Sequence, residues 1–108
     1  MQKRVILTES IPWKAWEGFP NDIGVKVLRD DEHCGARTLL VSIPPEGEVP
    51  SHSHRGTVQH YVIEGGCEID GADFAAGTFS LLPAHSDIPS IRSRHGAVVL
   101  MIYDPVGA

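Results

Sequence analysis

Short runs of β-forming residues recur along almost the whole chain and leave little room for helix. The runs are separated by Gly, Pro and Asp, which are the residues that most often form turns. Many short strands with turn signals between them are typical of a β-sandwich or a β-barrel, so we expect an all-β, antiparallel fold. The expected strands are RVILT (4–8), GVKVLR (24–29), RTLLVSI (37–43), TVQHYVIE (57–64), CEID (67–70), TFSLL (78–82), PSIRS (89–93) and AVVLMIYD (97–104).

Three polar or glycine-rich segments between these runs predict turns. The segment RDDEHCG (29–35) is polar and is expected to close a hairpin. The segment DGAD (70–73) contains an Asp-Gly pair, which is a strong hairpin signal. The segment EGG (64–66) predicts a further turn, so that CEID would be a short separate strand.

Helix is expected at most once, near residues 11–16. Ser10 would be the N-cap and Pro12 would lie in the first turn. Trp13 and Trp16 are three positions apart and would share one face of this helix. We expect both rings to cap an open end of the barrel as part of its core; the alternatives are a wall of a ligand pocket and a dimer contact.

Length and composition are those of one ordinary globular domain covering residues 1–108. Hydrophobic residues make up 42% of the chain and the formal net charge is −5, which argues against a nucleic-acid surface, since such a surface needs a basic stripe. No apolar run is long enough to span a bilayer, and the first residues do not form a signal peptide. We therefore expect a cytoplasmic protein with no membrane partner, in which Cys34 and Cys67 are free thiols.

Three of the six histidines lie in the segment SHSHRGTVQHYVIEGG (51–66). In an extended strand, residues i and i+2 point to the same face, so His52 and His54 would converge. Two imidazoles on one face suit Zn, Fe, Ni, Mn or Cu. The alternative interpretation is a solvated pair of loop histidines.

The spacing of these residues resembles the cupin family. The first cupin motif has two histidines one residue apart, then Glu and Gly, and its places correspond here to His52, His54, position 59 and Gly66. The second motif is partly matched by GTFSLLPAHSDI (77–88). The chain looks most similar to the cupin half of zinc-binding anti-sigma factors and to small acetylacetone- and dihydroxyacetophenone-type dioxygenases. The resemblance implies a small double-stranded β-helix (cupin, RmlC-like jelly-roll) barrel.

The chain departs from the cupin motifs at two of the usual metal ligands. Gln59 stands where the family has Glu, and Ile88 stands where it has a metal-binding His. By this resemblance, His52, His54, Gln59 and His85 would hold a divalent transition metal (Fe, Zn, Ni or Mn), with Asp87 as another possible carboxylate. The alternative is a metal-free pocket.

Strand alternation leaves two interpretations of the region after His54. If the strand breaks at Gly56, Gln59 and Tyr61 face the pocket and His60 points away. If the strand continues unbroken, His60 joins His52 and His54 instead. The cupin resemblance requires the break, so we favour the first interpretation.

The other candidate residues give weaker signals. Cys67 is expected to be a small buried hydrophobe. His33 and His95 are expected in solvated turns. Arg92 and Arg94 are expected to be surface charges, although they would suit an anionic substrate.

Two functions follow from the resemblance. The first is a dioxygenase-like enzyme acting on a small molecule, or a related isomerase or lyase, in which Tyr61 would orient the substrate. The second is a non-catalytic metal- or ligand-binding sensor or regulatory cupin. We also expect a homodimer, because exposed sheet edges are usually covered and RVILT is apolar enough to pair with a partner's sheet.

Overall fold

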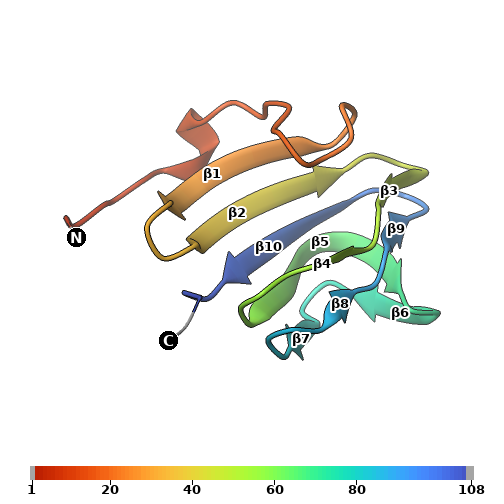
Figure 1. Cartoon of the computed structure of the whole chain (residues 1–108). Coiled ribbons are helices and arrows are strands. Elements are labelled where there is room, and N and C mark those ends of the chain that lie inside the picture. Colours follow the sequence, from red (N-terminus) through yellow and green to blue (C-terminus); the bar gives the residue numbers. More distant parts are fainter. Residues whose placement is uncertain (1, 107–108) are drawn as a thin grey trace.

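The structure is a computed structural model that describes residues 2–106. It is almost entirely antiparallel β-sheet, as the sequence predicts (Figure 1). The elements are the 3₁₀ turn η1 (Thr8–Ser10) and the strands β1 (Gly24–Asp31), β2 (Ala36–Ile43), β3 (Gly47–Val49), β4 (His52–Ser53), β5 (Val58–Ile69), β6 (Ala72–Ala75), β7 (Phe79–Leu82), β8 (Asp87–Ile88), β9 (Ile91–Ser93) and β10 (Ala97–Tyr103).

The strands form one curled eight-stranded sheet and one short two-stranded sheet. The large sheet has the order β1-β2-β10-β5-β9-β3, and β6 and β7 also pair with β5. Strands β4 and β8 form the small sheet. In Figure 1, β4 and β8 lie across from β10 and the first half of β5, so the sheets enclose an interior. This arrangement is the antiparallel barrel that we expected.

The longest strand, β5, links the two halves of the barrel. Its first half pairs with β10 and β7, and its second half pairs with β6 and β9. The expected turn at residues 64–66 is therefore wrong, because the strand runs through it with a register shift opposite β10. Gly65 adopts a φ of 71°, and a Cβ there would lie 2.1 Å from the Gly96 carbonyl oxygen. Glycine is required at this position by close backbone packing.

The two hairpin turns expected on polar signals are confirmed. Asp70 and Gly71 have φ of 52° and 79° and connect β5 to β6, as a primed hairpin turn requires. The segment 29–35 closes the hairpin of β1 and β2.

The core lies between the curled sheet and the strands that face it. Its side chains come from alternating positions of the strands, as expected for sheets with one buried face. The most deeply buried apolar residues are Ile23, Leu39, Val41, Ile43, Val58, Val62, Ile88, Ile91, Val99 and Met101.

The amino-terminal segment differs from the expectation. Residues 4–8 are not a strand, and residues 11–16 hold no helix; the one helical turn described is η1. Lys14 forms a β-bridge with Val25 of β1 instead, so the chain follows the edge of the sheet. Trp16 packs against the core as predicted, whereas Trp13 is 42% exposed and the Lys26 ammonium lies over its ring. Within residues 2–106 no helix is long and apolar enough to cross a membrane.

Candidate metal site in the barrel interior

His52 and His54 lie on and just after β4, and each ring is oriented by a backbone carbonyl. The His52 Nδ1 lies 3.2 Å from the Pro50 carbonyl oxygen, and the His54 Nδ1 contacts the Gly56 carbonyl oxygen. A carbonyl only accepts, so each Nδ1 carries the proton and donates it. This leaves each Nε2 with a free lone pair, which is the usual arrangement of histidines that bind metals. The His54 Nε2 is buried and has no partner within residues 2–106.

His60 lies on the inner face of β5 and is 2% exposed. Its neighbours on that face, Val58 and Val62, are fully buried, and Met101 of β10 lies directly opposite. Neither ring nitrogen has a hydrogen-bond partner among the described residues. Burial lowers the pKa of His60 from 6.5 to about 4. The charges of His52 and His54 contribute a smaller part of this lowering of the His60 pKa.

The three imidazoles have the right chemistry for a transition metal but are not preassembled around one. Within residues 2–106 no three His, Cys, Asp or Glu side chains stand ready to hold a metal ion. His52 is exposed on a two-residue strand, so its ring can reorient at little cost. The donor set fits Zn, Fe, Ni or Cu, since these metals accept neutral imidazole nitrogen. The buried, unpartnered nitrogens of His54 and His60 are the observation that supports this fit.

The orientation predicted for Gln59 and Tyr61 is wrong. Both side chains lie on the outer face of β5, where Gln59 donates to the Asp104 carboxylate over 3.4 Å and Tyr61 is 43% exposed. Gly56 does not change which side chains of β5 point into the barrel. A Cβ at Gly56 would meet the Asp104 carbonyl oxygen at 2.7 Å, so the glycine permits a close backbone approach before β5 begins. His60 therefore points into the barrel, as in the alternative interpretation.

The residues of the second motif are only partly near the histidines. Ile88 is fully buried and lies opposite His52 in the β4–β8 ladder, so an apolar side chain occupies the place of the family's histidine. Asp87 lies opposite Ser53 and is exposed. His85 is exposed in the turn before β8, with a φ of 61°. Its role as a ligand stays a prediction, and no contact among residues 2–106 supports it.

Sequence and structure comparisons identify the family. A model of the ChrR cupin-like domain matches residues 1–106. The chain is a cupin of that family. No curated protein matches it in sequence.

Solved structures agree with this fold. An acetylacetone dioxygenase from Acinetobacter johnsonii superposes with a TM-score of 0.79 at 14% identity, over 95% of this chain and 74% of that one. An RmlC-like cupin from Ralstonia eutropha JMP134 gives 0.82 at 22% identity, over 97% and 70% of the two chains. The complex of Rhodobacter sphaeroides SigE with the anti-sigma ChrR gives 0.71 at 23% identity, over 89% of this chain and 50% of that one.

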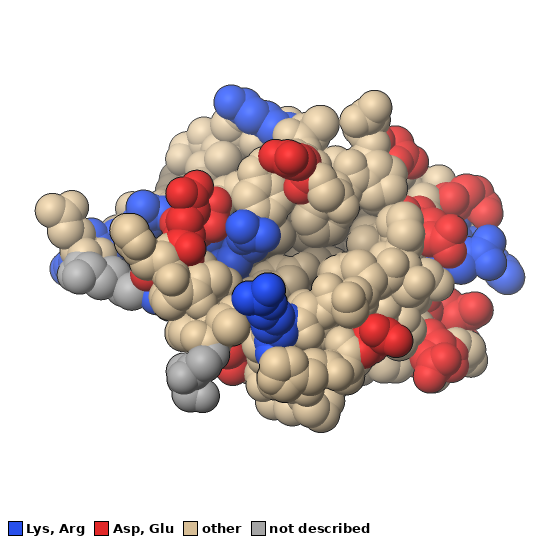
Figure 2. Space-filling model, viewed as in Figure 1, with Lys and Arg blue, Asp and Glu red and all other residues tan. Residues whose placement is uncertain are grey.

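This cupin has openings on two sides. Figure 2 shows a hollow near the centre of one face, beside β4, where the acidic and basic side chains are interspersed around the rim. A cavity of about 150 Å³ is lined by residues that include His54, Gly56, Tyr103 and Asp104. It gives the His54 side chain contact with the surface.

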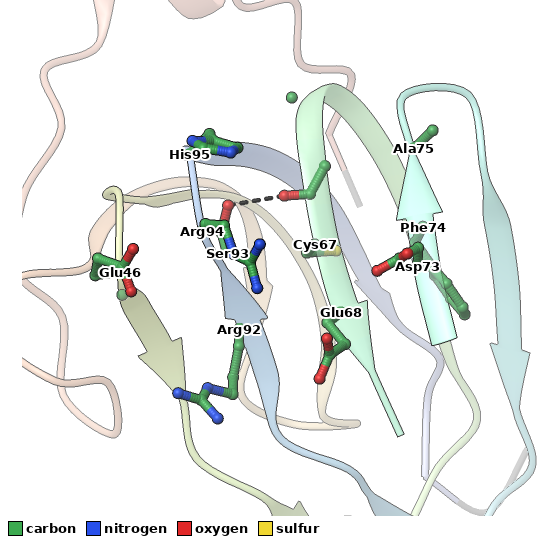
Figure 3. Close-up of a pocket in the computed structure, with 13 residues that line it drawn as sticks. Glu46, Cys67, Glu68, Asp73, Phe74, Ala75, Arg92, Ser93, Arg94 and His95 are labelled. Atoms are coloured by element: carbon green, nitrogen blue, oxygen red, sulfur yellow. Dashed lines mark hydrogen bonds between the residues drawn. The ribbon is translucent and has the colours of Figure 1, made fainter. Parts of the chain in front are cut away.

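A larger hollow, of about 890 Å³, lies elsewhere in the cupin, between β9 and the second half of β5 (Figure 3). His52, His54 and His60 do not line it. Its rim carries Arg94 and Arg92, and Arg92 pairs with exposed Glu48 at 3.8 Å, which supports the prediction of a surface charge. Cys67 in its wall is buried, as predicted, and burial raises the pKa of its thiol.

His60 is the candidate residue that the favoured sequence interpretation missed. A signal for it was present in the sequence, since Val58, His60 and Val62 alternate with more polar positions and share one face. The cupin resemblance, which requires a break at Gly56, favours the opposite orientation.

Proposed function

We propose that this cupin binds a divalent transition metal through His52, His54 and His60 and acts on a small molecule at that site. The observation that supports the proposal is His60, a buried histidine with both ring nitrogens unpartnered within the described chain. An unpaired buried polar group costs stability, so a ligand that pairs with it offers a physical reason for its presence.

The surroundings of His60 keep it in the form that binds metal. Metal binds the neutral imidazole, and a pKa of about 4 keeps His60 neutral at physiological pH. Val58, Val62 and Met101 exclude water from one side of the ring. Carbonyl contacts at Pro50 and Gly56 hold the rings of His52 and His54 with Nε2 free.

The first candidate activity is that of a dioxygenase-like enzyme on a dicarbonyl or hydroxyketone. A bound metal would supply Lewis acidity and orient the substrate. The chain's own contribution would be three neutral nitrogen ligands and a partly apolar interior. The likeness to an acetylacetone dioxygenase supports this candidate at the level of fold.

The second candidate is a sensor or regulatory cupin that binds metal without turnover. It is favoured by the position of Tyr61, which was expected to orient a substrate but lies on the outer face of β5. The family match to the ChrR cupin-like domain and the likeness to ChrR bound to SigE support it as well.

Metal loading tests the metal binding that both candidate functions share. Metal-free protein is incubated with Fe(II), Zn(II), Ni(II) or Mn(II), dialysed and analysed for bound metal. We expect about one ion per chain, and near-background binding in His52→Ala and His54→Ala, because two imidazoles hold a metal much more weakly than three. His33→Ala and His95→Ala, in exposed turns, are the matched controls and should bind normally. Equal binding by all four variants would overturn the proposal.

Oxygen uptake separates the two candidates. Iron-loaded protein is mixed with a β-dicarbonyl such as acetylacetone in an oxygen electrode. Uptake that disappears in His52→Ala supports the dioxygenase. Stoichiometric metal binding without uptake supports the sensor.

A further inference from the structure

The eight-stranded sheet splits where β5 and β9 separate. The ladder between these strands holds only two pairs, Glu68 with Arg92 and Ile69 with Ile91. On the amino-terminal side of Glu68, β5 pairs with β6 and β10, whereas β9 continues beside β3. The larger hollow, of about 890 Å³, lies in this split (Figure 3). Its volume falls within the range of small-molecule sites, roughly 300–1,000 Å³.

A buried serine fixes the separation of the two strands at this split. Ser93 is 2% exposed, and its hydroxyl donates to the Gly66 carbonyl oxygen over 2.7 Å. The same hydroxyl oxygen accepts a hydrogen bond from the Gly96 N–H at 2.9 Å. These bonds connect β9 to β5 across the gap, so the hollow is already formed in the free protein. A preformed site binds more tightly, because little has to be ordered when the ligand arrives.

The two walls of the hollow carry opposite charges. Arg94 directly follows β9, and Figure 3 shows its guanidinium directed into the gap between β9 and β5. His95 follows on the same wall. Glu68 of β5 and Asp73 of β6 line the opposite wall. Glu46 also lines the hollow, on the side of β9 that faces away from β5 (Figure 3).

The charges that face each other across the gap have no partners in the described chain. Of the two ion pairs among residues 2–106, one joins Arg92 to Glu48 and the other lies in the β1–β2 hairpin. Arg94, Glu68 and Asp73 form none. Glu68 lies directly opposite Asp73 in the β5–β6 ladder, and like charges in that position repel each other. A cationic group between these two carboxylates would remove the repulsion.

The hollow also has an apolar part between its charged walls. Cys67 and Phe74 lie opposite each other in the β5–β6 ladder, next to Glu68 and Asp73. Both residues line the hollow; Cys67 is buried, and Phe74 packs against the core. Gly66, beside Cys67, has no side chain to fill the space. Methylene groups of a ligand can therefore be shielded from water here.

We propose that this hollow binds a small dipolar molecule of the ω-amino acid class, with an ammonium group and a carboxylate joined by methylene groups. Arg94 binds the carboxylate, since a guanidinium and a carboxylate form two parallel hydrogen bonds. Glu68 and Asp73 bind the ammonium group. Cys67 and Phe74 contact the methylene groups. The hollow is separate from the three histidines, so this binding does not depend on a metal.

Titration of the metal-free full chain with 4-aminobutyrate and 6-aminohexanoate tests the proposal. Nitrogen–proton NMR spectra report which amides respond. We expect saturable shifts at concentrations below about 10 mM, concentrated in residues 46–47, 65–68, 73–75 and 92–95. Hexanoate and hexylamine carry one charge each and match 6-aminohexanoate in length. Each should bind about tenfold more weakly or worse, because one charged wall then stays unpaired.

Charge-removing variants test the role of each wall. Arg94→Gln and Glu68→Gln should each weaken the binding of 6-aminohexanoate about tenfold or more. Arg94→Gln should not weaken the binding of hexylamine, and Glu68→Gln should not weaken that of hexanoate. Arg55→Gln and Glu32→Gln are the matched controls, because both residues are exposed and lie outside the hollow, and they should bind normally. Circular dichroism verifies the fold of each variant.

Three results would overturn the proposal. The first is the absence of saturable shifts with either amino acid. The second is equal binding of 6-aminohexanoate and hexanoate, or binding that Arg94→Gln leaves unchanged. The third is a set of shifts centred on His54 and Arg55, which would place the amino acid in the smaller cavity.

Discussion

The two faces of β5 carry side chains of opposite character. Val58, His60 and Val62 point inward and are at most 2% exposed, whereas Tyr61 and Ile63 point outward and are more than 40% exposed. The inner face buries a polar ring that has no partner in the described chain, and the outer face exposes apolar groups to water. A buried ring without a hydrogen-bond partner and apolar side chains exposed to water both depart from what is usual in folded proteins. Such departures are expected at functional sites. We infer that the inner face serves a metal.

The pH dependence of stability probes the inner face and should show the largest effect. His60 has a folded pKa of about 4 against an ordinary value of 6.5, so the unfolded chain takes up a proton first as the pH falls. The free energy of unfolding of the metal-free protein should therefore decrease between pH 6.5 and 4, by on the order of 3 kcal/mol in total. Urea denaturation across this range measures the change.

The control for this titration is His60→Leu, which should lose most of the dependence between pH 6.5 and 4. Asp31 does not interfere, because hydrogen bonds from Cys34 and His33 hold the pKa of its carboxyl below 3.8. A wild-type curve parallel to that of His60→Leu would mean that His60 is solvated, which contradicts the inner-face assignment.

Replacing His60 by leucine should stabilise the metal-free protein at pH 7. Leucine has a similar volume and removes two unpaired nitrogens from an apolar site. We expect a gain of about 1–3 kcal/mol in the free energy of unfolding. Denaturation with a chelator present measures it. A loss of stability in this variant would show that the His60 ring has a structural partner in solution.

The smallest effect is expected on the outer face, from Gln59→Glu. The cupin motif has Glu at this place, and the sequence alone predicts that the change strengthens metal binding. The structure predicts no gain in affinity and a loss of stability below about 1 kcal/mol, because the new carboxylate faces that of Asp104. Restoring the charge balance with Asp104→Asn should recover the lost stability. A clear rise in metal affinity would instead place residue 59 inside the barrel.

Local signals in the sequence predicted most of the fold. Seven of the eight expected runs lie in strands, and the Asp70-Gly71 pair makes the predicted turn. The predictions are wrong where contacts between distant parts of the chain determine the local structure. Gly65 lies in a continuous strand because the backbone of Gly96 packs against it. Residues 4–8 are not a strand, because Lys26 and Leu28 hold them by isolated contacts rather than by a ladder.

For the same reason, the sequence predicts only part of the candidate site. The spacing of His52 and His54 placed both in one region, and the structure places His60 on the inner face of β5. Whether His60 or Gln59 faces inward depends on where β5 begins. The close approach of Asp104 to Gly56 sets that point, and no local pattern reveals this contact.

Metal affinity of two neighbouring variants tests the central claim most directly. His60→Ala and Gln59→Ala change adjacent residues on opposite faces of β5, and circular dichroism verifies that both fold. Competition titration with a chromogenic chelator then gives the dissociation constant of each. We predict that His60→Ala weakens binding by at least tenfold, the loss of about 1.4 kcal/mol or more, while Gln59→Ala binds like the unmodified protein. Weak binding by Gln59→Ala together with unchanged binding by His60→Ala would contradict the account.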